Sequence, residues 1–512
     1  MRIRRVTTAS GATAVQLVQY RHGQRKIVEH LGSAHTDEDL AVLEATARRR
    51  IEGGQQVFEF EELAPESRPA AAGGAAPVTA GAYTVGSRPR LLWDVLNIVY
   101  DRIGFDQIDS AAFRQLVVAR VIAPESKTAT LETLRTLDVT QVVSERTMWR
   151  HLGRCVTKNW RDTACQAAYR FAAGDGVLAV VLYDVTTLYF ETDEEDEHRK
   201  VGFSKERRVD PQILVGLLVD KHGFPLEIHS FTGNSAETNT IIPVLDAFKA
   251  RHSVEDMLVV ADAGMLSFAN LQALEQAGYQ YIVGSRNSKA PYDLAETFAS
   301  RGNNFTDGEV FEATTSLKKN VASSQRRAVW QYRLAREHRD RRSHTKQVQR
   351  AEDIAAGRKP QRRARFVTGG GPKTVAVDYE AAQAAELYFG LKGYVTSASQ
   401  QVMSAPEVIS AYHSLFEVER SFRMSKTDLR ARPIFSYTRD SIEAHLSVVF
   451  CALAISRHIQ QATGQSIRRF LRTLQPLREA VIDINGQLIT VPAALTPEAR
   501  DILSNLNIDP TT

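Results

Sequence analysis

Cysteine is scarce in this chain of 512 residues, which has only three, Cys155, Cys165 and Cys451. Their wide spacing lacks the paired pattern of a zinc site, and the odd number argues against a framework of disulfides. No apolar segment typical of a signal peptide follows the first residue, and the longest apolar stretch, Leu446–Ile455, is too short to cross a membrane. These absences argue against a disulfide-rich secreted protein and a membrane-spanning one, so we expect a soluble protein of the cytoplasm.

The chain also lacks a strong charge of either sign, because its formal net charge is only +4 at pH 7. Its basic residues are nevertheless concentrated: residues 333–365 hold twelve Lys and Arg against four Asp and Glu. Such a segment could cover DNA, since each neutralised phosphate releases counterions; the alternative is a solvated surface. By contrast, Glu191–Glu197 is acidic at six of seven positions. Consecutive acids on a loop cannot all point inward, which favours a solvated loop tip over a metal site.

A chain of this length needs more than one hydrophobic core, and its patterns predict an α/β fold of several domains. The central elements are expected in the order strand 177–190, hairpin 212–230, helix 238–251, strand 257–262, helix 271–278 and strand 281–284. Strands followed by alternating strands and helices give a mixed sheet, and this order suits a ribonuclease H-like core.

Changes in composition along the chain predict the domain boundaries. We expect a β-hairpin and helix segment at 1–63, a flexible Ala/Gly/Pro-rich linker at 64–88, a helical region that binds DNA ends at 89–174, the first part of the core at 175–300, a β-rich and basic insertion at 301–397, the core's catalytic helix and the helix after it at 398–460, and a C-terminal tail at 461–512. Within the first segment, residues 37–51 have helical periodicity. The tail includes a strand-like stretch at 480–490 that could serve dimerisation.

One helix of the 89–174 region has the features of a DNA reader. Ser144 is a good N-cap, and Arg146, Arg150 and Arg154 follow four residues apart on one face. This resembles the second helix of a helix-turn-helix motif and makes Arg146 and Arg150 candidate DNA contacts. The alternative is a packing helix whose arginines reach into water. Tryptophans are more often core residues than base-stacking wedges, so Trp149, Trp160 and Trp330 are predicted to be core residues.

Three carboxylates stand where a metal-dependent nuclease would need them. Asp184 ends the apolar run 177–184, Asp262 ends the run 257–262, and Glu419 lies in the helical stretch 412–426. Two aspartates on strands and a glutamate on a helix can converge on a pair of divalent cations, which is how phosphodiester bonds are cut and joined. These three residues are the candidate catalytic and metal-binding set.

The stretch around Glu419 places polar groups on an otherwise apolar helical face. The face comprises Tyr412, Leu415, Glu419, Phe422 and Lys426. Ionised groups are costly to bury unless they are paired or bound to a metal, and a metal-bound carboxylate with a lysine for a phosphate satisfies both requirements. The alternative is a Glu–Lys pair on a solvated face.

The spacing Tyr412-x2-Leu415-x3-Glu419-x6-Lys426 resembles the Tyr-x2-Arg-x3-Glu-x6-Lys signature of DDE transposases from bacterial insertion sequences. Other segments of the chain also resemble sequence motifs that recur in that family. These segments are 184–191, 202–205, 233–237, 260–266 and 432–434. The resemblance implies a ribonuclease H-like core whose three carboxylates bind two Mg²⁺ ions, with Mn²⁺ able to substitute. It also implies that Tyr412 and Lys426 hold the backbone of the transposon end.

One position departs from that signature, because Leu415 stands where the family has arginine. Arg423, four residues after Glu419 on nearly the same helical face, could supply the missing phosphate contact. Lys205 and Asn234, on loops near the core, are further candidate DNA contacts.

The expected function is therefore that of a transposase. It would bind double-stranded DNA at the terminal inverted repeats, cleave it with a divalent metal, and transfer the 3′-hydroxyl ends to target DNA. The resemblance implies a homodimer on DNA, associated with the nucleoid and with no membrane partner. Two alternatives remain: a catalytically decayed copy that regulates by binding DNA, and a hydrolase in which two carboxylates act as acid and base, as in glycosidases.

Overall fold

The computed structural model describes residues 2–7, 13–21, 24–34, 82–139, 141–174, 176, 178–203, 209–254, 257–265, 267–316, 325–360, 364–369, 375–484 and 487–509. The chain divides into two compact units, Met1–Thr79 and Ala80–Thr512. The helix predicted at 37–51 and residues 64–81 of the predicted linker lie outside the described residues.

The first unit contains an antiparallel sheet of three strands in sequence order. They are β1 (Arg2–Thr7), β2 (Thr13–Arg21) and β3 (Gln24–Ala34). Val15 and Val18 of the middle strand are buried. The hairpin structure predicted within residues 1–63 is therefore confirmed for these strands.

The second unit is built on a sheet of eight strands, in the order β10-β11-β14-β9-β8-β5-β6-β7. The five strands of the predicted core are β5 (Val180–Tyr189), β6 (Gln212–Asp220), β7 (Pro225–Thr232), β8 (Leu258–Ala261) and β9 (Gln280–Gly284). β5, β8 and β9 run parallel, whereas β6 and β7 form an antiparallel hairpin beside β5. Every residue of β6 is buried, as expected of a strand covered on both faces.

Short helices connect these strands, as the sequence predicted. The connecting helices are α7 (Ile241–His252), α8 (Phe268–Gln276), α9 (Ala290–Asp293) and α10 (Ala295–Arg301), with 3-10 turns η2 (Glu237–Asn239), η3 (Ala263–Met265) and η4 (Asn287–Lys289). The order hairpin, helix, strand, helix, strand is that of a ribonuclease H-like core.

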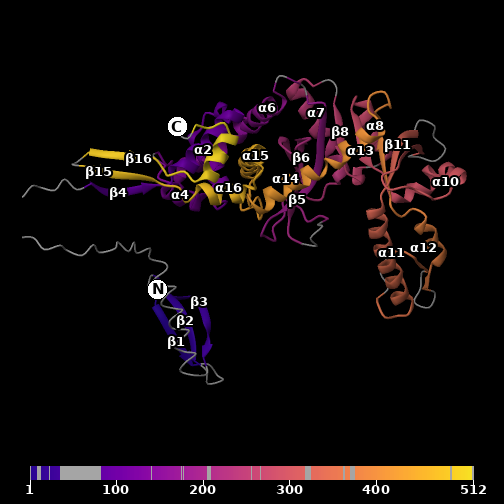
Figure 1. The fold of residues 1–512 in the computed structure, drawn as a ribbon, viewed down its shortest axis with the longest axis horizontal. Coiled ribbons are helices and arrows are strands. Elements are labelled where there is room, and N and C mark those ends of the chain that lie inside the picture. Colours follow the sequence, from indigo (N-terminus) through magenta and orange to yellow (C-terminus); the bar gives the residue numbers. More distant parts are fainter. Residues whose placement is uncertain are drawn as a thin grey trace, which may run out of the picture. The chain divides into compact units, whose positions relative to one another are not determined.

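The three longer strands of the predicted insertion, 301–397, belong to the core sheet. These strands, β10 (Val310–Ser316), β11 (Gln325–Tyr332) and β14 (Leu391–Thr396), extend the core sheet, because β14 pairs with β9. The basic stretch largely forms one long helix, α11 (Leu334–Ala355). Together with β12 (Val367–Thr368), β13 (Ala376–Val377) and α12 (Tyr379–Glu386) it belongs to a small lobe, whose two helices project from the end of the sheet (Figure 1).

A helical layer packs on the other side of the central helix α15 (Arg439–Thr463), which lies between that layer and the sheet (Figure 1). The helices are α2 (Arg90–Ile103), α3 (Ala111–Ile122), α4 (Lys127–Thr136), α5 (Glu145–Thr157) and α6 (Trp160–Ala173), with the 3-10 turn η1 (Phe105–Gln107). By length and composition α15 could cross a membrane, but 94% of its apolar window is buried inside the protein. It is placed as the core helix of this unit.

The C-terminal residues are part of the second unit, which corrects the prediction of a tail. β15 (Glu479–Ile484) pairs with β16 (Gln487–Val491) on one side and with β4 (Ala82–Arg88) on the other. β4 was predicted to be the end of the linker, and it is ordered because its backbone bonds to a strand almost four hundred residues later. Helices α16 (Ile467–Leu474) and α17 (Pro497–Asn505) bury apolar side chains in the same core.

Candidate active site

The two predicted aspartates are brought together by the register of two parallel strands. Tyr183 of β5 is paired with Ala261 of β8. Asp184 and Asp262 directly follow this pair, so they lie side by side at the ends of two neighbouring strands. Adjacent strands lie about 4.8 Å apart, which places both carboxylates at one point of the sheet. Asp184 is half-buried and Asp262 is exposed.

The alternation of β5 directs Asp184 toward the helices that follow the insertion. Tyr183 points to the opposite face, where its hydroxyl donates to Thr240 at 2.8 Å. Thr186, on the same face as Asp184, accepts a hydrogen bond from Lys426. Lys426 thus lies on the same side of the sheet as Asp184.

The stretch 412–426 is not one straight helix, which corrects the prediction. It forms α13 (Ala405–His413) and α14 (Phe416–Thr427), separated by tight turns in which Leu415 N–H donates to Tyr412 at 3.0 Å and Val418 N–H donates to Leu415 at 3.1 Å. Leu415 is buried at this break. Its apolar side chain packs into the core where the family signature has arginine, so no phosphate contact comes from this position.

Tyr412, at the end of α13, is tied directly to the second aspartate. Its hydroxyl donates to Asp262 Oδ1 at 3.1 Å, and the Ala263 N–H donates to the same oxygen at 2.7 Å. Burial raises the pKa of the Tyr412 phenol well above its ordinary value, and the nearby charges of Asp262 and Glu419 raise it further. Tyr412 is therefore a neutral donor that fixes one oxygen of Asp262.

Lys392, on β14, is a site residue that sequence reasoning missed. Its ammonium lies over the Tyr412 ring, 5.2 Å from the centroid. Burial and Arg336 lower the pKa of Lys392, while Asp262 raises it. Gly284 provides the space for both side chains, since a Cβ there would come within 2.5 Å of the Tyr412 hydroxyl and 3.1 Å of the Lys392 ammonium. Only pairing of β14 with β9 reveals this lysine, because no local motif marks it.

The third carboxylate, Glu419, is exposed on α14. It is near enough to Tyr412 to influence the pKa of that phenol.

Glu237, a carboxylate of η2, is a further acidic neighbour, with its Oε2 3.8 Å from where a Cβ on Gly264 would lie. Within the described part of the chain, no three His, Cys, Asp or Glu side chains are grouped closely enough to hold a metal ion. Asp262 and Glu419 are exposed, so both can change rotamer without displacing packed groups.

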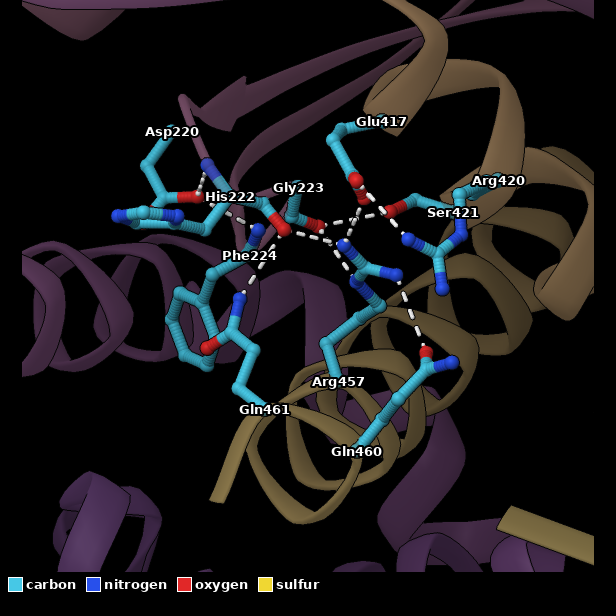
Figure 2. Close-up of polar contacts among 10 residues, drawn as sticks. All are labelled: Asp220, His222, Gly223, Phe224, Glu417, Arg420, Ser421, Arg457, Gln460 and Gln461. Carbon is cyan, nitrogen blue, oxygen red and sulfur yellow. Dashed lines mark hydrogen bonds and ion pairs between the residues drawn. The ribbon is translucent and has the colours of Figure 1, made fainter. Parts of the chain in front are cut away.

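α14 is held in place by a buried ion pair on its other side (Figure 2). Arg457 of α15 is 2% exposed and binds Glu417, with 2.5 Å between its nitrogen and the carboxylate. The same guanidinium donates to the carbonyls of His222 and Gly223 in the turn between β6 and β7. Ser421 of α14 also donates to Gly223, at 2.7 Å. These bonds join α14, the central helix α15 and the hairpin beside β5.

Asp220 belongs to this turn, at the end of β6. Its Oδ1 accepts from the N–H groups of His222 at 2.9 Å and Phe224 at 2.7 Å (Figure 2). The acidic loop is likewise mostly exposed. Two N–H groups and the Arg199 guanidinium bind its Asp196 and lower the pKa of that carboxyl to about 2 against the effect of burial.

The other predicted DNA contacts lie outside the catalytic cluster or outside the described residues. Arg423 and Asn234 are exposed, on α14 and on the turn after β7, and Lys205 is not among the described residues. Arg146 and Arg150 are exposed on α5, which Ser144 caps as predicted.

The opposite face of α5 is buried through Met148, Leu152 and Cys155. Trp160 and Trp330 are buried as predicted, whereas Trp149, at 46% exposure, is not a core residue.

Comparison with known proteins gives a family for this arrangement. The model of the family described as "Transposase DDE domain" matches residues 176–455. Among solved structures, the piggyBac transposase synaptic complex with hairpin DNA is similar over 77% of this chain and 80% of that chain, at 10% identity and a TM-score of 0.35. The Mos1 transposase paired-end complex with left transposon end covers 47% of this chain and 66% of that chain, at 13% identity and a TM-score of 0.16. No curated protein sequence matches the chain.

Proposed function

The chain belongs to the DDE transposase family and is a transposase, and from this premise we propose that it mobilises a bacterial insertion sequence by cleaving and joining DNA at the Asp184–Asp262 cluster. It would bind the terminal inverted repeats as a homodimer, close to the nucleoid in the cytoplasm. The single observation that carries the proposal is the parallel register of β5 and β8, which puts two carboxylates side by side under α13 and α14.

The donor set suits a hard divalent cation, because its ligands are carboxylate oxygens. Asp184, Asp262 and Glu419 would hold two Mg²⁺ ions, with Mn²⁺ as a substitute, and such ions when bound lower the pKa of a nucleophilic water or 3′-hydroxyl and neutralise the leaving oxygen. Tyr412 keeps Asp262 oriented by donating to its Oδ1. The buried ion pair of Glu417 with Arg457 keeps α14, and with it Glu419, against the sheet.

The cations beside the carboxylates would position the scissile strand. Lys426 stands next to Asp184 through Thr186, and Lys392 stands next to Asp262 over the Tyr412 ring. A lysine ammonium is a point charge that binds a phosphate oxygen without demanding one orientation. Lys392 therefore offers the phosphate contact that Leu415 cannot make, and Arg423 remains a second candidate on α14.

The experiment that tests the proposal is cleavage of labelled DNA carrying the element's own ends, with Mg²⁺ or with EDTA. The wild-type protein should nick at the element boundary only with the metal, and Asp184→Asn should bind the same DNA without nicking it. Binding without cleavage under any divalent metal would contradict the proposal and favour a regulator that has lost its activity. Cleavage that persists in EDTA would contradict the role of the metal.

A further inference from the structure

A cleft of about 500 Å³ lies between the helical layer and the segment that follows α14. None of the three signature carboxylates lines it. Its walls come from the end of α3, the start of α4, one side of α5 and the chain after α14. Its cationic and aromatic lining includes Arg120, Lys127, Trp149, Arg430 and Phe435.

The cleft contains positive charge without a compensating carboxylate. Arg120 and Lys127 are half-buried, and Arg430 is exposed at the wall. In the described part of the chain none of these three side chains forms an ion pair. Lys127 donates to Ser436 Oγ at 3.1 Å and Arg120 to the Leu429 carbonyl at 3.5 Å, both of which are neutral groups.

Desolvation of these cations is strong enough to change their titration. Burial lowers the pKa of Lys127 to about 8, with a contribution from Arg120, and burial lowers the pKa of Arg120 to about 10. The buried His445 imidazole has a pKa well below its ordinary value, because of burial and these same two cations. Charges removed from water are costly unless an opposite charge meets them, so an anion in the cleft would stabilise this arrangement.

Two acids also line the cleft, but within the described residues neither forms an ion pair with these three cations. Glu125 accepts from the Thr133 hydroxyl at 3.2 Å, and Glu191 is exposed at the end of β5. Two features add to the attraction for an anion. The N-terminal residues of α4 line the cleft, where the helix dipole is positive. Arg430 has a φ of +44°, a conformation uncommon for this residue type and frequent at ligand sites.

Aromatic rings complete the cleft. The Lys127 ammonium lies 5.8 Å from the centroid of the Trp149 ring, which is 46% exposed although the sequence predicted a core residue. Phe435, at 60% exposure, lines the same cleft. Aromatic faces beside a cationic groove are the combination that binds the phosphate of a nucleic acid strand together with its sugar or base.

We propose that this cleft binds one backbone phosphate of the DNA, held by Lys127, Arg120 and Arg430, with Trp149 and Phe435 against the attached deoxynucleoside. The site rests on the proposed function, because it assumes that DNA is the substrate. Its position suits that role: it adjoins α5, which carries Arg146 and Arg150, and the chain that leaves the catalytic helix. A strand bound there would connect the end-binding helices to the catalytic cluster.

Lys127→Gln tests the site, with Lys221→Gln as the matched control. Both changes remove one lysine charge, but Lys221 is exposed in the β6–β7 turn and does not line the cleft. Binding of a duplex carrying the element's end would be measured by fluorescence anisotropy in EDTA, at several salt concentrations. Lys127→Gln should weaken binding about tenfold, the effect of losing a charged hydrogen bond. It should also reduce the slope of log K against log[salt] by about 0.9, and Lys127→Arg should restore most of the affinity.

Trp149 provides a direct readout, because it is the exposed one of the four tryptophans: Trp93 is half-buried, and Trp160 and Trp330 are buried. The same duplex should change the tryptophan emission of the wild type; this change should need about tenfold more DNA in Lys127→Gln and should be lost in Trp149→Phe. Inorganic phosphate alone, at the same concentrations, should produce no saturable change. Equal affinities and slopes for Lys127→Gln and Lys221→Gln would overturn the site, and so would an emission change that phosphate reproduces in full.

These outcomes are separable from failure of the proposed function. If the wild type binds DNA through this cleft but never cleaves it, the function fails and the site stands. If the wild type cleaves at the element boundary and Lys127→Gln behaves like its control, the function stands and the site fails. Thermal melting of each variant would show whether a loss of affinity reflects unfolding.

Discussion

Glu417 and Glu419 lie two residues apart on α14 and meet opposite surroundings. Glu417 is 13% exposed and faces the Arg457 guanidinium, which is itself tied to the turn between β6 and β7. Glu419 is exposed on another side of the helix, within electrostatic reach of Tyr412. Glu417 is neutralised by the Arg457 guanidinium. Glu419 instead lies near Tyr412, whose hydroxyl already donates to Asp262.

The difference shows how one helix can serve both structure and chemistry. A carboxylate that forms an ion pair with a buried arginine fixes the position of its helix. An exposed carboxylate such as Glu419 can change rotamer and take a cation from solution. The comparison predicts that substitutions on the Arg457 side change stability, whereas substitutions on the Asp184 side change catalysis and leave stability largely unaltered.

The largest expected effect is on catalysis, from Asp184→Asn. Charge stabilisation by a metal amounts to several kcal/mol, so cleavage should fall by about a thousandfold or more. The matched control is Asp193→Asn in the acidic loop, where the carboxylate is exposed and we expect no loss. The measurement is the rate of nicking of end-carrying DNA with Mg²⁺. A similar loss in both variants would remove the distinction between the cluster and the loop.

The next effect is on stability, from Arg457→Met. Removing one partner of a buried ion pair leaves an uncompensated charge and should lower the free energy of unfolding by about 3–5 kcal/mol. Arg420 binds the same Glu417 at 2.9 Å but is 42% exposed. Arg420→Met should therefore cost less than about 1 kcal/mol. Urea unfolding of both variants measures the contrast, and equal losses would mean that Glu417 is not held mainly from the buried side.

A smaller effect on catalysis is expected from Tyr412→Phe, which removes the donor to Asp262. A hydrogen bond to a charged group contributes about 1.5–3 kcal/mol, so the cleavage rate should fall about tenfold to a hundredfold. Because the pKa of Tyr412 is raised, the phenol stays protonated through neutral and mildly alkaline pH, and the effect should not depend on pH there.

Tyr394→Phe is the control for Tyr412→Phe. The hydroxyl of Tyr394 contacts His413 at 3.2 Å, so its removal leaves the hydrogen bond between Tyr412 and Asp262 in place. If both tyrosine variants slow cleavage equally, the loss comes from packing beneath the site and not from the Asp262 contact.

The smallest effect concerns Asp293 of α9, a buried carboxylate outside the candidate active site. Desolvation raises the pKa of Asp293 to about 6. A folded-state pKa above the ordinary value of about 3.8 means that the charged form destabilises the fold as pH rises through this window. Asp293→Asn should therefore be more stable than the wild type at pH 8, by about 1–3 kcal/mol, and about equal at pH 4. Thermal melting at the two pH values would check this, and a pH-independent difference would contradict it.

Much of the candidate catalytic cluster could be predicted from local patterns. Asp184 and Asp262 were recognisable because each ends an apolar run that is long enough for a buried strand. Glu419 and Lys426 were recognisable by their spacing within a helical stretch. The residues that sequence reasoning missed have no such pattern. Lys392 belongs to a short strand of the insertion, and it reaches Asp262 only because β14 pairs with β9.

The sequence by itself determined the alternation of strands and helices in the core, the carboxylates at the ends of two strands and the capped helix with its arginines. These follow from periodicity, apolar runs and capping, which depend on neighbours along the chain. Tertiary structure decided the break at Leu415, the extension of the core sheet by the insertion, the pairing of β4 with β15 and the pair of Glu417 with Arg457. Each of these depends on free energy gained between segments far apart in the chain: burial of an apolar side chain, backbone hydrogen bonds at a sheet edge, or a counter-charge. No window of local sequence contains those partners.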